Sequence, residues 1–75
     1  MTLFDCEKGT VYEIVEVKIN NTSLKKHLEN LGIKKWETLA ICFESFKRKA
    51  LLVCVAGGNV AIDEKICKQI EVKKA

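Results

Sequence analysis

The sequence predicts a mostly β fold, a small closed barrel of about five short strands with one inserted α-helix and one short helical turn. Several stretches are rich in the β-branched and aromatic residues that suit a pleated surface. Only one stretch carries apolar residues at helical spacing, and a pair of glycines falls where a hairpin turn is expected. Closing the sheet into a barrel would also remove exposed strand edges.

The first two strands are indicated by their residue types and by alternation. Thr10–Ile19 follows the turn-forming pair Lys8 and Gly9 and is rich in Val, Ile and Tyr. Its alternation is imperfect, which predicts a β-bulge near Glu13 and a strongly bent strand. In Thr38–Glu44, large apolar residues alternate with smaller or polar ones, the pattern of a strand with one buried face.

The second half of the chain predicts three more strands. Ala50–Ala56 is apolar throughout, so most of its surface should be buried. Gly57–Asn59 supplies a hairpin turn into Val60–Ile62, and these two strands should pair in antiparallel fashion. A helical turn capped by its first residue is expected over Asp63–Cys67. The final short strand is expected over Gln69–Val72.

One amphipathic helix is predicted over Ser23–Leu31. Leu24, Leu28 and Leu31 recur at positions i, i+4 and i+7, and a glycine then ends the pattern. The leucines should pack against the barrel, while the lysines between them face solvent. His27 flanks the apolar stripe and is interpreted as a boundary residue without a chemical role.

Length and charge limit the classes of function. The 75 residues predict a single domain, 1–75, that is too small for a deep internal substrate cavity. The net charge of +3 is weak beside the dense basic patches of nucleic-acid-binding proteins. The longest apolar run, over Ala50–Ala56, is far shorter than the roughly 20 residues that span a bilayer.

Neither a metal site nor a catalytic site is predicted. The four cysteines have no CxxC spacing and the chain has one histidine, so we expect no structural metal, no cofactor and no enzymatic activity. The start of the chain lacks the pattern of a signal peptide, which predicts a cytoplasmic protein. In a reducing compartment the thiols are expected to be small buried hydrophobic groups; they are Cys6, Cys42, Cys54 and Cys67.

The order of these features resembles the ferrous iron transport protein A (FeoA) family over nearly the whole chain. The most specific stretch is LKKHLENLGI at Leu24–Ile33, followed by Gly-x-x-x-Ala-Ile from Gly57 and by Ile70 and Val72 near the end. Two positions depart from the family pattern, because glycines are usual where this chain has Tyr12 in the first strand and Trp36 after the helix. At both positions a large aromatic side chain therefore stands where a residue without a side chain is usual.

The resemblance implies an SH3-like barrel and an accessory role in bacterial ferrous iron uptake. The implied partner is a membrane iron permease with a G-protein domain (FeoB-like), met at the inner face of the membrane by protein–protein contact, without nucleic acid and without membrane insertion. Activating nucleotide hydrolysis, gating the pore and stabilising the assembly are all compatible with this role. The alternatives are a detached SH3-like module of an iron-dependent transcriptional regulator and a small nucleic-acid-binding barrel.

Trp36 is the basis of the predicted partner surface. If the indole is exposed, it could occupy the centre of an interface, with neighbouring lysines as a polar rim; the alternative is that it folds back over the core. Arg48 is the only arginine and therefore the only candidate for an arginine finger. The simpler interpretation is that it is a solubilising residue of a turn. The predicted partner-binding residues are Lys25, Lys26, Lys34, Lys35, Trp36 and Arg48.

Overall fold

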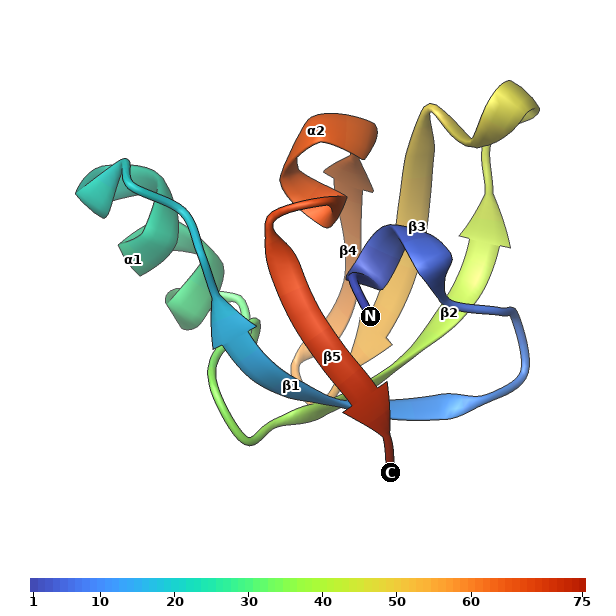
Figure 1. Cartoon of the computed structure of the whole chain (residues 1–75), viewed down its shortest axis with the longest axis horizontal. Coiled ribbons are helices and arrows are strands. Elements are labelled where there is room, and N and C mark those ends of the chain that lie inside the picture. Colours follow the sequence, from blue (N-terminus) through green and yellow to red (C-terminus); the bar gives the residue numbers. More distant parts are fainter.

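A computed structural model describes residues 1–75 and contains one five-stranded sheet with two helices and two 3₁₀ turns (Figure 1). The elements, in chain order, are η1 (Leu3–Asp5), β1 (Val11–Val17), α1 (Thr22–Asn30), β2 (Thr38–Glu44), η2 (Phe46–Arg48), β3 (Ala50–Val55), β4 (Gly58–Asp63), α2 (Glu64–Cys67) and β5 (Ile70–Lys74). All five predicted strands and both predicted helical segments are present, whereas the two 3₁₀ turns were not predicted.

The sheet is antiparallel throughout, with the strand order β4-β3-β2-β1-β5. This confirms the mostly β prediction but corrects one detail, because β4 and β5 are the two ends of the sheet and do not pair to close it. The reason is the connection between them. The helix α2 joins β4 to β5 and contacts η1 and β3, so the chain bridges this end of the molecule with helical turns (Figure 1).

The bend in β1 arises from a register shift against β5 between Ile14 and Glu16. Before the shift the buried side chains are Tyr12 and Ile14, and after it the buried side chain is Val17. The bulge therefore moves the inward face from even to odd positions. This explains the imperfect alternation of the sequence and confirms the predicted bulge close to Glu13.

The helix α1 lies apart from the strands, to one side of the sheet (Figure 1). The Asn21 side chain caps it by accepting a hydrogen bond from the Leu24 N–H at 3.0 Å. Leu28 is its only buried residue, while Leu24 packs on the core with part of its surface exposed. No helix of the chain is long and apolar enough to cross a bilayer.

The core is apolar, with no buried polar or charged residue. Its 16 members come from every strand, from α1 and α2, from η1 and from the connecting segments. They are Leu3, Cys6, Tyr12, Ile14, Val17, Ile19, Leu28, Ile33, Leu39, Ile41, Leu51, Val53, Ile62, Cys67, Ile70 and Val72. Since the core fills the space inside the bent sheet, the candidate functional groups lie on the outer surface.

Candidate docking surface

Three of the predicted lysines line one surface depression of about 250 Å³. Lys25 comes from α1, while Lys34 and Lys35 come from the loop that follows it. Two carboxylates share this depression, and the four ion pairs of the chain all lie elsewhere, so the three ammonium groups have no carboxylate partner within 4.0 Å. The full lining is Glu16, Val17, Lys25, Glu29, Lys34 and Lys35. We call this set the lysine depression.

Trp36 follows the lysine depression in sequence and lies on the surface, with 62% of its area exposed. Of the two alternatives for Trp36, the structure therefore has the exposed indole and not the one folded back over the core. The Lys35 Nζ lies 5.2 Å from the centre of the Trp36 ring, within cation–π range. A lysine and an exposed aromatic thus project together from the same short turn.

The backbone conformation at this position is one that favours glycine. Trp36 has a φ of +75°, the left-handed conformation that favours glycine. The turn is fixed at both sides, because the Trp36 N–H donates to the Ile14 carbonyl at 2.8 Å and the Glu37 carbonyl accepts from the Ile14 N–H at 2.9 Å. The chain keeps a large side chain at a position where glycine would avoid steric strain.

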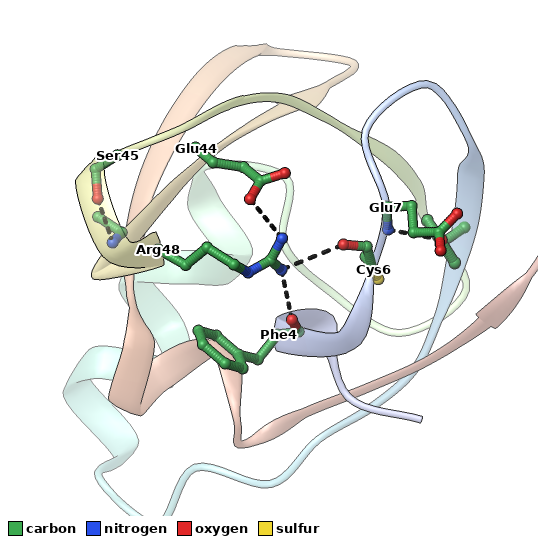
Figure 2. A network of polar contacts seen from close by, with 8 residues as sticks. Phe4, Cys6, Glu7, Glu44, Ser45 and Arg48 are labelled. Atoms are coloured by element: carbon green, nitrogen blue, oxygen red, sulfur yellow. Dashed lines mark hydrogen bonds and ion pairs between the residues drawn. The ribbon is translucent and has the colours of Figure 1, made fainter.

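The two remaining predicted residues do not join the lysine depression. Lys26 is exposed on α1 but is not part of its lining. Arg48 lies in η2, where its guanidinium is hydrogen-bonded to other groups of the same chain (Figure 2). It donates to the Glu44 carboxylate, to the Phe4 carbonyl at 2.6 Å and to the Cys6 carbonyl at 3.2 Å.

Arg48 thereby joins the turn after β2 to the N-terminal segment. Its guanidinium also lies 5.1 Å from the Phe4 ring, and its own φ is +54° after a Lys47 φ of +62°. An arginine finger needs a free guanidinium, whereas this one is already occupied by two carbonyls and a carboxylate. The geometry fits a structural clamp, and the sequence could not show it because the two carbonyl partners lie more than 40 positions away.

Replacing Arg48 by lysine tests the clamp. The substitution keeps the charge but removes the planar fork, so the Phe4 and Cys6 carbonyls should lose part of their hydrogen bonding. We expect the free energy of unfolding to fall by about 1 kcal/mol, a modest value because the group is partly exposed to water. Urea unfolding measures it, with Lys49→Ala as the control at an exposed neighbouring side chain; equal effects of the two substitutions would contradict the clamp.

The cysteines divide into two pairs of different character. Cys6 and Cys67 are buried, as predicted, and burial raises the pKa of their thiols to about 11 and about 12. For Cys42 and Cys54 the prediction of buried, unpaired thiols is wrong, because these two half-buried residues are joined as a disulfide between β2 and β3. The chain contains no group of three or more His, Cys, Asp or Glu side chains arranged to hold a metal ion.

The model of the FeoA domain family matches residues 1–74 of the sequence. The chain belongs to the FeoA family. This confirms the resemblance, and the family is one of iron transport. No curated protein sequence matches this FeoA domain.

Solved structures agree with this assignment. The FeoA protein from Chlorobium tepidum superposes with a TM-score of 0.90 at 18% identity, over 99% of this chain and 70% of that one. The iron(II) transport protein A from Clostridium thermocellum gives a TM-score of 0.90 at 17% identity, over 100% of this chain and 46% of that one. These likenesses establish the SH3-like fold that the sequence predicted.

The same fold occurs inside larger proteins. The manganese regulator SloR superposes with a TM-score of 0.80 at 21% identity, over 100% of this FeoA domain but only 34% of the regulator. The domain thus corresponds to about a third of that chain. At this level of identity the likeness concerns the fold alone.

Proposed function

We propose that this FeoA domain is a cytoplasmic accessory protein of ferrous iron uptake, recruited to the inner face of the membrane, that docks on an iron permease carrying a G-protein domain. The contact is made by Trp36 and the lysine depression, and the role is one of binding rather than catalysis. The observation that carries the proposal is the exposed indole beside three lysines that lack carboxylate partners. The partner surface should accordingly be acidic with an apolar centre.

Trp36 supports this role because its exposure is combined with a fixed backbone. Two backbone hydrogen bonds to Ile14 anchor the turn, so the indole projects from a rigid support. A rigid aromatic loses little conformational entropy on binding, and tryptophan is enriched among the residues that dominate interface energies. The strained left-handed conformation at Trp36 is then maintained for a side chain that contributes little to the core.

The lysines support the acidic character of the partner. Lys25, Lys34 and Lys35 outnumber the two carboxylates of the depression, which leaves a local excess of one positive charge. Lys26 extends the same charge along the exposed side of α1. Charges of this kind accelerate association with an oppositely charged surface and make the rate depend on salt.

Fluorescence of Trp36, the single tryptophan, provides the test. The free domain should show red-shifted emission that iodide quenches readily, and adding the purified cytoplasmic G-protein domain of the permease should shift the emission to the blue and protect it. Trp36→Ala should weaken binding, measured by calorimetry, by about 10- to 30-fold. The double substitution Lys34→Glu with Lys35→Glu should weaken binding more at low salt than at high salt.

Two controls separate docking from folding. Lys65→Glu reverses the charge of one exposed lysine outside the depression and should leave binding close to unchanged. Trp36→Gly removes the indole and also relieves the steric strain of the positive φ. This variant should therefore be more stable than Trp36→Ala by about 1 kcal/mol, yet bind the permease domain as weakly as Trp36→Ala does. Unchanged emission on adding the permease domain, or normal binding by both Trp36 variants, would refute the docking surface.

The second candidate is a detached module of a metal-dependent regulator, favoured by the likeness to SloR. Such a module would leave Trp36 unprotected by the permease domain and would instead bind the remainder of a regulator chain. A nucleic-acid-binding barrel is less well supported, because Arg48 is held by its own chain. The aromatics beside Arg48 that such a barrel would use for base stacking are Phe43, 59% exposed, and Phe46, 85% exposed.

A further inference from the structure

Cys42 lies on β2 and Cys54 on β3, two adjacent strands of the sheet. Their Cα atoms are 6.0 Å apart, within the range that a disulfide spans. The register of the two strands shifts between Ile41 and Phe43, so Cys42 occupies the bulge, while Cys54 pairs with Ala40. The bulge thus places two residues 12 positions apart within bonding reach, although no CxxC motif is present.

This pair lies on the outer side of the sheet. The neighbouring residues Ile41 and Val53 are buried in the core, whereas Cys42 and Cys54 are only half-buried. Cys54 also lines a shallow depression of about 260 Å³ with exposed Val11 at its edge. All residues around this depression are uncharged; they are Val11, Thr38, Leu39, Ala40, Cys54, Val55 and Ala56. A small thiol or disulfide reagent can therefore approach the Cys54 sulfur from solvent.

The other two cysteines differ from this pair in their exposure to solvent. Cys6 and Cys67 are almost completely buried, and burial keeps both thiols protonated near neutral pH. Thiol–disulfide exchange requires access and a thiolate, and Cys6 and Cys67 have neither. Oxidation should thus be confined to the outer pair.

We propose that Cys42 and Cys54 form a reversible thiol–disulfide couple that controls how firmly the turn between β2 and β3 is held. The loop closed by the bond contains η2 and therefore Arg48, the clamp to the N-terminal segment. In the oxidised form the two strands are crosslinked beside this turn, and in the reduced form hydrogen bonds and the clamp alone hold it. The proposal does not depend on the permease as partner.

The exchange balances with a small-molecule disulfide as oxidant. The thiolate of one cysteine attacks the disulfide, forms a mixed disulfide and releases one small thiolate. The second cysteine then attacks the protein sulfur of that mixed disulfide, so that the Cys42–Cys54 bond forms and the second small thiolate leaves. Two protons pass from the two cysteines to the two released thiolates, the protein loses two electrons and the reagent gains them. A small thiol or dithiol reverses each step.

Alkylation of the full chain under native conditions measures the state of each cysteine. After equilibration with glutathione and its disulfide at ratios spanning the cytosolic poise, the folded protein is treated with iodoacetamide and its mass and peptides are analysed. We expect two alkyl groups, on Cys42 and Cys54, at reducing ratios and none at oxidising ratios, with complete reversal. Cys6 and Cys67 should become alkylated only after unfolding in urea.

The melting temperature gives an independent measurement. A disulfide that closes a loop of this size should raise it by about 10 °C in the oxidised form, and the Cys42→Ser/Cys54→Ser variant should show no dependence on the glutathione ratio. Four results would overturn the proposal. They are pairing that involves Cys6 or Cys67, a stable mixed disulfide with glutathione, bonds between chains, and a Cys42–Cys54 bond that the folded protein neither loses nor regains.

Discussion

Replacing Tyr12 by alanine is expected to lower the free energy of unfolding by about 3–5 kcal/mol. The phenol is the largest fully buried side chain, with 1% of its area exposed. Its ring lies within the bent part of β1, and alanine would leave a cavity that the surrounding strands cannot fill without moving. Since a domain of this size has a total stability of about 4–11 kcal/mol, the variant should be close to unfolding at room temperature.

The hydroxyl of Tyr12 makes a separate contribution. It accepts a hydrogen bond from the Glu7 N–H at 2.9 Å and so fixes the segment between η1 and β1. Tyr12→Phe keeps the ring and removes only this acceptor, so it should cost about 1 kcal/mol, the usual net value of one hydrogen bond. Chemical unfolding monitored by circular dichroism measures both variants.

Three outcomes of the Tyr12 experiment can be distinguished. A large effect of alanine with a small effect of phenylalanine places the contribution in packing, as we expect. Equally large effects of alanine and phenylalanine would place the contribution in the Glu7 hydrogen bond. A cost below about 1 kcal/mol for alanine would mean that the strand collapses around the missing ring.

Tyr12 and Trp36 show how far the sequence alone could lead. The resemblance identified both as aromatics at glycine positions, yet one is buried and the other exposed. The difference depends on the bulge after Ile14, which sets the face of every residue in β1, and on the left-handed backbone at Trp36. Periodicity indicated the bulge but could not fix its position to the residue, so it could not assign Tyr12 to the inside.

The strands themselves were predictable because their signals are local. Alternation predicted β2 with its observed bounds, and the glycine pair predicted the β3–β4 hairpin. The Arg48 clamp and the Cys42–Cys54 pair were not predictable, since each depends on residues that meet only through the tertiary fold. The clamp joins positions more than 40 apart, and the cysteine pair requires an irregular register between two strands.

Replacing Leu28 by alanine is expected to cost about 2–4 kcal/mol, because this residue provides most of the attachment of α1 to the sheet. Leu28 is 4% exposed and is the only buried residue of the helix. The helix has nine residues, fewer than an isolated helix needs to be stable in water. Its helical state should therefore depend on this packing, and urea unfolding together with amide hydrogen exchange measures the two effects.

Leu31 supplies the matched control, since it belongs to the same apolar pattern and follows directly after α1 but is 37% exposed. Leu31→Ala should cost less than about 1 kcal/mol, because little apolar area is lost from the core. For Leu28→Ala, exchange should accelerate in α1 more than in the strands, since the helix is the least anchored element of the fold. Equal costs for the two leucines would show that α1 is held by its whole apolar face, whereas acceleration spread evenly over helix and sheet would show that α1 unfolds only with the entire domain.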